Sequence, residues 1–230
     1  MISNSTNAGE EYLRYPLPEI EKFLKGVKEI VFVPYAAVTF SYAEYERRVQ
    51  ERFAEIGIKV RSVHRSKTPA KMIREAEAIC VGGGNTFALS KKMQEQGLLS
   101  AILGKLKKDT PYVGWSAGSN MCCPTICTTN DMPIVEPSSF KAIGAIKFQI
   151  NPHYMDANPA GHAGETREQR ILEYIQANPR RYVAGLREGC MLHYEGDKLE
   201  LIGKKPMRIF KKGIETFEVQ PGDDLSFLLK

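Results

Sequence analysis

The segment Gly114-Trp115-Ser116-Ala117-Gly118 has the residue pattern of a nucleophilic serine. An apolar run at 111–113 predicts a buried strand before it, and the small residues after Ser116 can open a helix. A serine on this sharp turn exposes its hydroxyl, and the flanking glycines leave room for the turn. The N–H of Ala117, at the start of the helix, would stabilise an oxyanion. Because so short a pattern also arises by chance, its weight depends on partners elsewhere in the chain.

A serine nucleophile needs a general base, and the chain has four histidines to supply one. His153 follows the run at 147–150, so we expect it at the carboxyl end of a strand, on the same rim as Ser116. His64 is expected on the surface, His193 in a strand as a structural or exposed residue, and His162 in a loop rich in glycine and alanine. His153 is therefore the predicted base, although a lone histidine is often structural.

A buried carboxylate should orient the imidazole, and two candidates remain open. Glu188 follows the apolar run at 182–186, again at a strand end, but it could be an exposed turn residue before Gly189. Asp131 lies in a polar loop downstream of Ser116, where it could instead form an Asx turn.

Three consecutive glycines, Gly82-Gly83-Gly84, follow a predicted strand and precede a predicted helix. The spacing is not that of a dinucleotide-binding loop, and the lysine and hydroxyl residue of a P-loop are missing. The alternatives are a tight strand-to-helix turn and a second oxyanion donor. For an oxyanion hole, the N–H of Gly84 is the predicted partner of the Ala117 N–H.

Arg167 opens a predicted helix in which Thr166 and Gln169 have the spacing of a capping box. The helix dipole disfavours a cation in the first turn. An arginine there is either an ordinary surface residue or a bidentate partner for a substrate carboxylate.

Alternating strand and helix patterns must position these residues. Strands are expected at 29–33, 58–63, 78–81 and 112–115, and helices from Tyr42, from Pro69 with Thr68 as its N-cap, over 85–96 and from Leu99. This order predicts an α/β fold with a mostly parallel sheet flanked by helices on both faces, whose ligand site lies at the carboxyl ends of the strands. After about Met191, short strands with turns at 195–197 and 212–213 predict antiparallel hairpins.

Composition narrows the class of protein. The 230 residues, 43% hydrophobic and 26% charged, fit one globular domain over 1–230. A net charge of +5 is too modest and too scattered to predict nucleic-acid binding, and the basic stretch at 204–212 is expected to be a solvated hairpin face rather than a phosphate site. No signal peptide or membrane span is predicted, and five cysteines without metal-site spacing suggest reduced thiols in the cytoplasm.

Five motifs together resemble the peptidase E family of α-aspartyl dipeptidases over nearly the whole chain. They are Gly-Gly-Gly-Asn-Thr-Phe at 82–87, Gly-Trp-Ser-Ala-Gly at 114–118, Thr-Thr-Asn-Asp-Met-Pro-Ile-Val at 128–135, Gln-Ile-Asn-Pro-His at 149–153 and Gly-Glu-Thr-Arg-Glu-Gln-Arg at 164–170. The resemblance implies a fold similar to class I glutamine amidotransferases. It also implies hydrolysis of dipeptides with N-terminal aspartate, without a cofactor or metal.

Carried over to this sequence, the resemblance makes Ser116 the nucleophile and His153 the base. It makes Arg167 the residue that binds the side-chain carboxylate of the substrate's aspartate. It leaves Asp131 and Glu188 as alternatives for the third catalytic member. Two departures are visible: only Met1-Ile2 precede Ser-Asn-Ser-Thr where the family has an apolar strand, and Arg187 stands where the family has proline.

The expected partner is a small acidic dipeptide, and a monomer and a homodimer are equally compatible with the sequence. Two other functions remain possible. A cyanophycinase-like enzyme would cleave an aspartyl–arginine polymer with a similar serine turn, and a non-catalytic protein on the same fold would only bind a small molecule.

Overall fold

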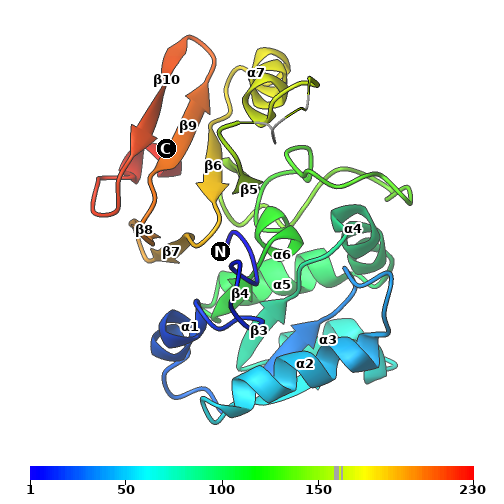
Figure 1. Ribbon diagram of the computed structural model, residues 1–230. Helices are drawn as coiled ribbons and strands as arrows, with labels where there is room; N and C mark the ends of the chain where they lie inside the picture. The colour runs from blue at the N-terminus through cyan, green and yellow to red at the C-terminus, as the bar shows by residue number, and fades with distance from the viewer. Residues whose placement is uncertain (158–160, 162) are drawn as a thin grey trace.

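The computed structural model describes residues 1–157, 161 and 163–230, and Figure 1 shows its helices and strands. The first part of the chain alternates helix and strand. In order, it forms α1 (Leu17–Phe23), β1 (Glu29–Val33), α2 (Tyr42–Ala54), β2 (Lys59–Ser62), the 3-10 helix η1 (Val63–Arg65), α3 (Pro69–Arg74), β3 (Ala78–Val81), α4 (Thr86–Glu95), α5 (Leu98–Leu106), β4 (Tyr112–Gly114) and α6 (Ala117–Asn120).

The rest of the described chain contains more strands than helices. In order, it forms β5 (Gln149–Tyr154), α7 (Arg167–Ala177), β6 (Val183–Arg187), β7 (Met191–Glu195), β8 (Lys198–Ile202), β9 (Met207–Lys211), β10 (Ile214–Val219) and the 3-10 helix η2 (Ser226–Leu229). The predicted turns lie between β7 and β8 and between β9 and β10.

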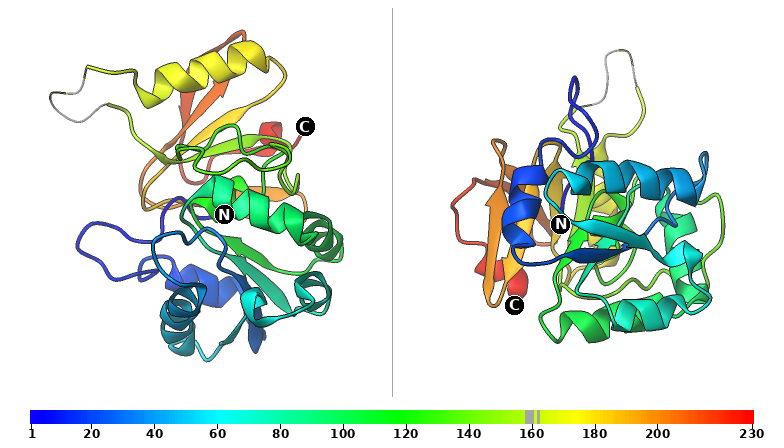
Figure 2. Two further views of the ribbon diagram at one scale, coloured as in Figure 1. Left: turned by 90° about the vertical axis from the view of Figure 1, so that its right-hand side faces the viewer. Right: turned by 90° about the horizontal axis from the view of Figure 1, so that it is seen from below.

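The strands form two four-stranded sheets and a hairpin. The first sheet is parallel, in the order β2-β1-β3-β4. In the second sheet, in the order β10-β9-β6-β5, β5 and β6 are parallel and β9 and β10 run antiparallel. The β7–β8 pair is antiparallel. The predicted α/β class is confirmed, with its parallel pairing divided between two sheets (Figure 2).

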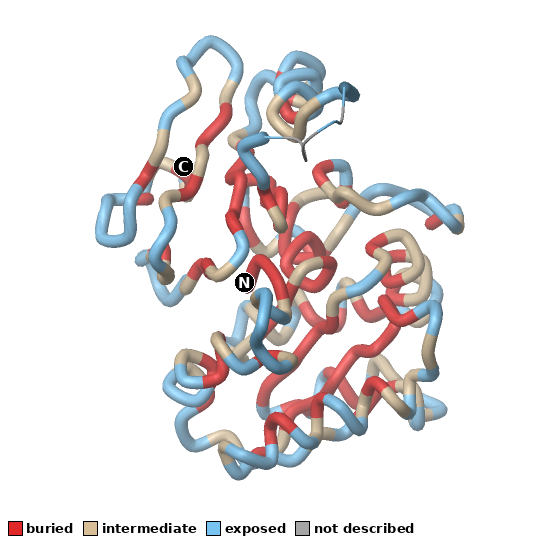
Figure 3. The backbone as a smooth tube through the Cα atoms, viewed as in Figure 1, coloured by how far each residue is buried: buried red, intermediate tan, exposed pale blue. Residues whose placement is uncertain are grey.

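Helices cover both faces of the first sheet. Alternate residues of β1 pack on opposite faces because side chains alternate along a strand. Val31 contributes to a core with α3, α4 and α5, whereas Phe32 contributes to a core with α1 and α2. In the second sheet, α7 packs on one face, and the β7–β8 hairpin with η2 contributes to the core on the other. Figure 3 shows the most deeply buried segments running through both sheets.

Side chains cap three of the described α-helices, α2, α4 and α7. Ser41 caps α2 by accepting a hydrogen bond from the N–H of Glu44, and Asn85 caps α4 in the same way. The capping box of Thr166 and Gln169 is present with both of its hydrogen bonds. Thr68 occupies the predicted N-cap position of α3, with Pro69 as the first helical residue, but its side chain makes no capping bond, and its torsions are φ −132° and ψ 64°.

At the amino terminus, Ile2 pairs through isolated bridges rather than in a strand. Ile2 forms isolated bridges with Trp115, just after β4, and with Met191 of β7. The amino terminus therefore lies between the elements of the two sheets (Figure 1).

Candidate active site

Ser116 occupies the turn between β4 and α6 in a conformation that few serines adopt. Its φ is 53° and its ψ is −114°, a strained geometry that directs the side chain out of the turn. The turn requires Gly118, because a Cβ there would lie 2.1 Å from the carbonyl oxygen of Val81. The strand, the turn and the glycine spacing thus form the predicted serine elbow.

His153 lies on β5 and joins Ser116 to Glu188. Its Nε2 is 2.9 Å from Ser116 Oγ, and its Nδ1 is 2.7 Å from Glu188 Oε1. Both distances are within hydrogen-bond range, and a neutral imidazole that donates from Nδ1 leaves Nε2 free to accept. Glu188 follows directly after β6, so the two neighbouring parallel strands bring the base and the carboxylate to the same edge.

Asp131 lies elsewhere in the site. Its Oδ2 accepts hydrogen bonds from the N–H of Thr86, at 2.7 Å, and from Thr129 Oγ1, at 3.1 Å. The contact with Thr86 satisfies a free N–H in the first turn of α4, where the helix dipole favours an anion. No hydrogen bond joins Asp131 to His153 among the residues that the structure describes.

Neither of the other two histidines in the described part of the chain contacts Ser116, His153 or Glu188. His64, expected on the surface, is partly exposed in η1, where its Nδ1 lies 2.6 Å from Ser62 Oγ. His193 is partly buried in β7, 3.6 Å from Glu195. His162 lies outside the described residues.

Two backbone N–H groups are unpaired near Ser116. Within the described chain, neither Gly84 N nor Ala117 N has a hydrogen-bond acceptor. Gly84 has a φ of 132°, and a Cβ there would lie 2.3 Å from the carbonyl oxygen of Ala36. Only glycine therefore allows this approach.

An aromatic pair fixes the glycine loop against the elbow. Tyr45 Oη donates to the carbonyl of Gly83 at 2.9 Å and accepts from Trp115 Nε1 at 3.1 Å. Burial raises the pKa of Tyr45 to about 12, so it stays a neutral donor. The loop that carries Gly84 and the residue before Ser116 are thus held together by one hydroxyl.

A cavity of about 220 Å³ opens beside the serine. The serine turn with α6, α4, the loop after α6, β5 and α7 supply the residues that line it. These residues are Thr86, Ser116, Asn120, Thr129, Asn130, Asp131, Pro152, His153 and Arg167. The charged side chains are one carboxylate, Asp131, and one guanidinium, Arg167. Five of these residues were not predicted from the sequence, and all of them except Asn120 lie in the motifs described above; they are Thr86, Asn120, Thr129, Asn130 and Pro152.

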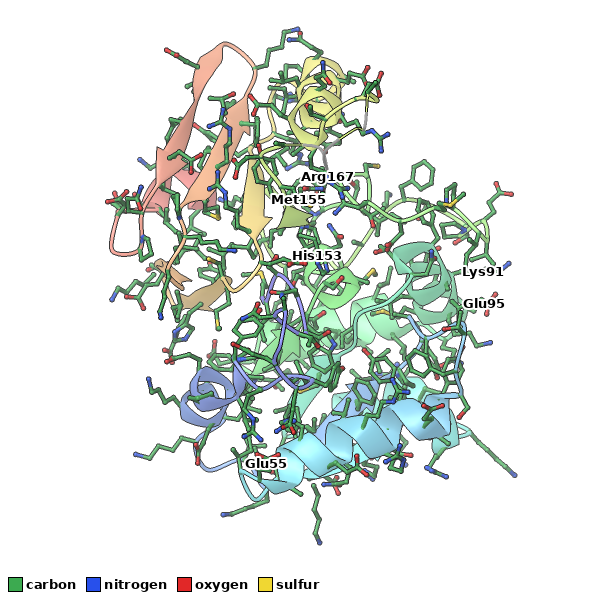
Figure 4. All side chains as sticks on the ribbon, in the orientation of Figure 1. Glu55, Lys91, Glu95, His153, Met155 and Arg167 are labelled. Atoms are coloured by element: carbon green, nitrogen blue, oxygen red, sulfur yellow. The ribbon has the colours of Figure 1, made fainter. Side chains whose placement is uncertain are left out.

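Arg167 is half-buried at the first position of α7. Figure 4 shows it on the same side of the molecule as His153. Burial and the neighbouring Arg170 lower its pKa, whereas Asp131 raises it. Within the described chain it has no ion pair. A guanidinium in this setting can bind a carboxylate in the cavity.

Among the described residues, no group of three His, Cys, Asp or Glu side chains is arranged to hold a metal ion. None of the described helices combines the length and apolar character needed to span a membrane. All five cysteines are free thiols.

The chain matches one protein family over nearly its full length. The family model described as "Peptidase family S51" matches residues 1–202. The chain is 49% identical to a "Peptidase E" of Nostoc sp. over 231 residues, which covers 100% of this chain and 96% of that protein. It is 44% identical to a "Peptidase E" of Salmonella typhimurium, which covers 96% and 97%.

A solved structure supports the fold. A peptidase from an acI-B1 Actinobacterium superposes with a TM-score of 0.67 at 16% identity, covering 98% of this chain and 95% of that one. At that identity the likeness concerns the fold alone. The family model and the curated relatives carry the further conclusion that this chain belongs to peptidase family S51 and is a peptidase.

Proposed function

We propose that the protein is a serine-dependent dipeptidase that hydrolyses Asp-Xaa dipeptides through an acyl-enzyme. One observation carries most of the proposal: Ser116 Oγ, the imidazole of His153 and the carboxylate of Glu188 form a continuous chain of contacts at 2.9 and 2.7 Å. A nucleophile, a base and a group that orients the base are the parts that acyl transfer requires.

In this mechanism Ser116 Oγ attacks the scissile carbonyl while His153 Nε2 takes its proton. The negative charge that develops on the carbonyl oxygen is stabilised by the N–H groups of Gly84 and Ala117. His153 then protonates the leaving amine, and a water molecule, activated by the same imidazole, hydrolyses the ester on Ser116. Glu188 orients the ring and stabilises the imidazolium.

The two charges in the cavity suit a substrate whose first residue is aspartate. Arg167 would bind the side-chain carboxylate of that residue, and Asp131 would bind its free α-ammonium group. A buried guanidinium left without a partner penalises neutral analogues, so this pairing favours an acidic first residue. The cavity of about 220 Å³ also favours a small peptide over a polymer.

The test is the release of free amino acids from Asp-Leu, beside Ala-Leu, Glu-Leu and N-acetyl-Asp-Leu. The parent protein should cleave Asp-Leu, should discriminate against the other three, and should keep its activity in EDTA. Ser116→Ala should bind Asp-Leu without cleaving it. Cleavage by Ser116→Ala, or loss of activity with chelator and recovery with zinc, would contradict the mechanism. If a folded parent protein cleaves aspartyl–arginine polymer in preference to dipeptides, a cyanophycinase-like activity is favoured; binding without turnover of either favours a binding protein.

A further inference from the structure

The first residues of the chain lie against all three elements of the proposed catalytic chain. Ile2, Ser3 and Asn4 are 2%, 0% and 1% exposed, although they are within a few residues of the amino terminus. In Figure 1 this end of the chain lies between the two sheets, and in Figure 3 the tube beside it is coloured as buried. A polar Ser-Asn pair buried this deeply needs partners for its hydrogen-bonding groups.

Each of the three residues bonds one catalytic segment. The carbonyl oxygen of Ile2 accepts from the N–H of Ser116 at 3.0 Å. The hydroxyl of Ser3 accepts from the N–H of His153 at 2.9 Å. The side-chain oxygen of Asn4 accepts from the N–H of Gly189, the residue after Glu188, at 2.9 Å.

The hydrogen bond from the His153 N–H to the Ser3 hydroxyl replaces a backbone hydrogen bond that the sheet lacks at this residue. The register between β5 and β6 shifts between Pro152 and Tyr154, so His153 lies in a bulge, and its φ is 53°. Bulges leave one residue unpaired and often redirect a side chain next to an active site. Here the Ser3 hydroxyl fills the gap, because it also donates to the carbonyl of Leu186 on β6 at 2.7 Å.

The contact with Gly189 fixes the turn that carries Glu188. Gly189 has a φ of 83°, as a tight turn requires. The Asn4 amide is itself held in place: Tyr15 Oη donates to its Oδ1 at 2.7 Å, and its Nδ2 donates to the carbonyl of Thr6 at 2.9 Å. The orientation of the amide, and so of the turn, is set by partners on both of its sides.

From these contacts we infer that Ser3 and Asn4 are positioning residues, which hold the strained backbone of His153 and the turn of Glu188 so that imidazole and carboxylate meet in line with Ser116. The inference rests on the proposed function. Loss of the Ser3 hydroxyl would leave the His153 N–H and the Leu186 carbonyl unpaired in a buried place, and the bulge would relax. Small displacements of a catalytic base cost large factors in rate.

A kinetic cycle tests this inference. Ser3→Ala should lower kcat for Asp-Leu by about 10- to 100-fold with little change in KM, because Arg167 and Asp131 lie on other elements. In a Glu188→Ala background the same change should cost less than about 3-fold, since the pair that Ser3 positions is already broken. In a Ser116→Ala background, Ser3→Ala should leave the dissociation constant for Asp-Leu unchanged.

Ser62→Ala is the matched control. Ser62 is also 0% exposed, and its hydroxyl bonds one side chain, that of His64, but it lies on β2, which pairs with β1 at the edge of the first sheet. It should change kcat by less than about 2-fold in both backgrounds. If Ser3→Ala unfolds at the assay temperature, the same cycle is measured with Tyr15→Phe, which removes one hydrogen-bond donor to Asn4. The expected loss of kcat is then about 2- to 5-fold.

The inference is overturned if Ser3→Ala, folded, keeps the parental kcat, or if its effect is equally large with and without Glu188. Failure of the proposed function gives a different result, since Ser116→Ala would then retain activity or the parent protein would cleave no dipeptide.

Discussion

Glu188 Oε1 lies 2.7 Å from Nδ1 of His153; His153 lies on β5, and Glu188 follows directly after the neighbouring parallel strand β6. The other candidate carboxylate, Asp131, instead accepts the N–H of Thr86 in the first turn of α4. The two acids therefore have different environments: Asp131 lines the cavity, whereas Glu188 contacts the imidazole of His153. Each environment leads to a separate prediction.

Glu188→Gln tests the orienting role. A glutamine keeps the size of the side chain but can present its amide to Nδ1 and select the wrong tautomer of His153. We expect kcat/KM for Asp-Leu to fall by about 10²- to 10⁴-fold. Initial rates at saturating and limiting concentrations of Asp-Leu measure this fall in kcat/KM. Glu195→Gln, which alters an exposed carboxylate 3.6 Å from His193, is the control and should retain the parental rate. A parental rate in Glu188→Gln would remove Glu188 from the mechanism.

Asp131→Asn tests the binding of the substrate amine. An asparagine oxygen can still accept the N–H of Thr86, so this N–H in the first turn of α4 stays paired while the negative charge is lost. We expect KM for Asp-Leu to rise by about 10-fold or more with a smaller change in kcat, and the preference for Asp-Leu over N-acetyl-Asp-Leu to shrink. A fall in kcat as large as that of Glu188→Gln, with KM unchanged, would instead assign Asp131 to the chemical step.

Arg167→Met tests the recognition of the side-chain carboxylate. Methionine keeps much of the aliphatic volume and removes the charge, and the capping box of Thr166 and Gln169 stays intact. The parent protein should prefer Asp-Leu to Asn-Leu by about 10²-fold or more, and the variant should lose most of that preference. The measurement is the ratio of kcat/KM for the two peptides. Arg170→Met, one turn along the same helix and paired with Glu165, should keep the parental ratio.

Local patterns explain how much of this molecule could be predicted. The glycine turns, the alternation of strand and helix, and the capping box of Thr166 depend on neighbours within a few residues, and the structure contains them. The same reasoning identified Ser116, His153 and Glu188 as residues at strand ends. It could not choose between Asp131, in a polar loop after Ser116, and Glu188, at a strand end, because no local pattern shows which carboxylate reaches His153.

Features that depend on distant segments could not be predicted. The division of the parallel strands between two sheets follows from tertiary packing. The role of Ser3 depends on a bulge in β5 and on a carbonyl of β6, about 150 and 183 residues away along the chain. Thr68 occupies the N-cap position of α3, but its side chain makes no capping bond. In the sequence, Ser3 belongs to a polar run after Met1-Ile2, and nothing in that run indicates that Ser3 is buried.

Arg187 forms an ion-pair network, and this network allows a prediction of how the stability of the protein depends on pH. Its guanidinium binds both oxygens of Asp156, one of them at 2.9 Å, and both oxygens of Glu218, at 2.7 and 2.8 Å. The Arg187 side chain is only 11% exposed. The network joins β6, the segment after β5, and β10.

Hydrogen bonds from Arg187 are the largest cause of the lowered pKa values of Asp156 and Glu218. Because the pKa of each acid is lower in the folded than in the unfolded protein, the stabilisation is fully present above the unfolded values, near pH 4. It is lost as the pH falls through the lower, folded values. Arg187→Met should therefore reduce the free energy of unfolding by about 1–3 kcal/mol at pH 7, and by less at pH 3.

Urea unfolding of the parent protein and of Arg187→Met, at pH 7 and at pH 3, measures the difference directly. Arg47→Met is the control, since Arg47 pairs with Glu51 on α2 with both side chains 61% exposed. An exposed pair of this kind should contribute less than about 0.5 kcal/mol at either pH. If Arg187→Met costs the same at pH 3 as at pH 7, its loss reflects packing against Tyr154, whose ring lies 5.4 Å from the guanidinium carbon, rather than the two carboxylates.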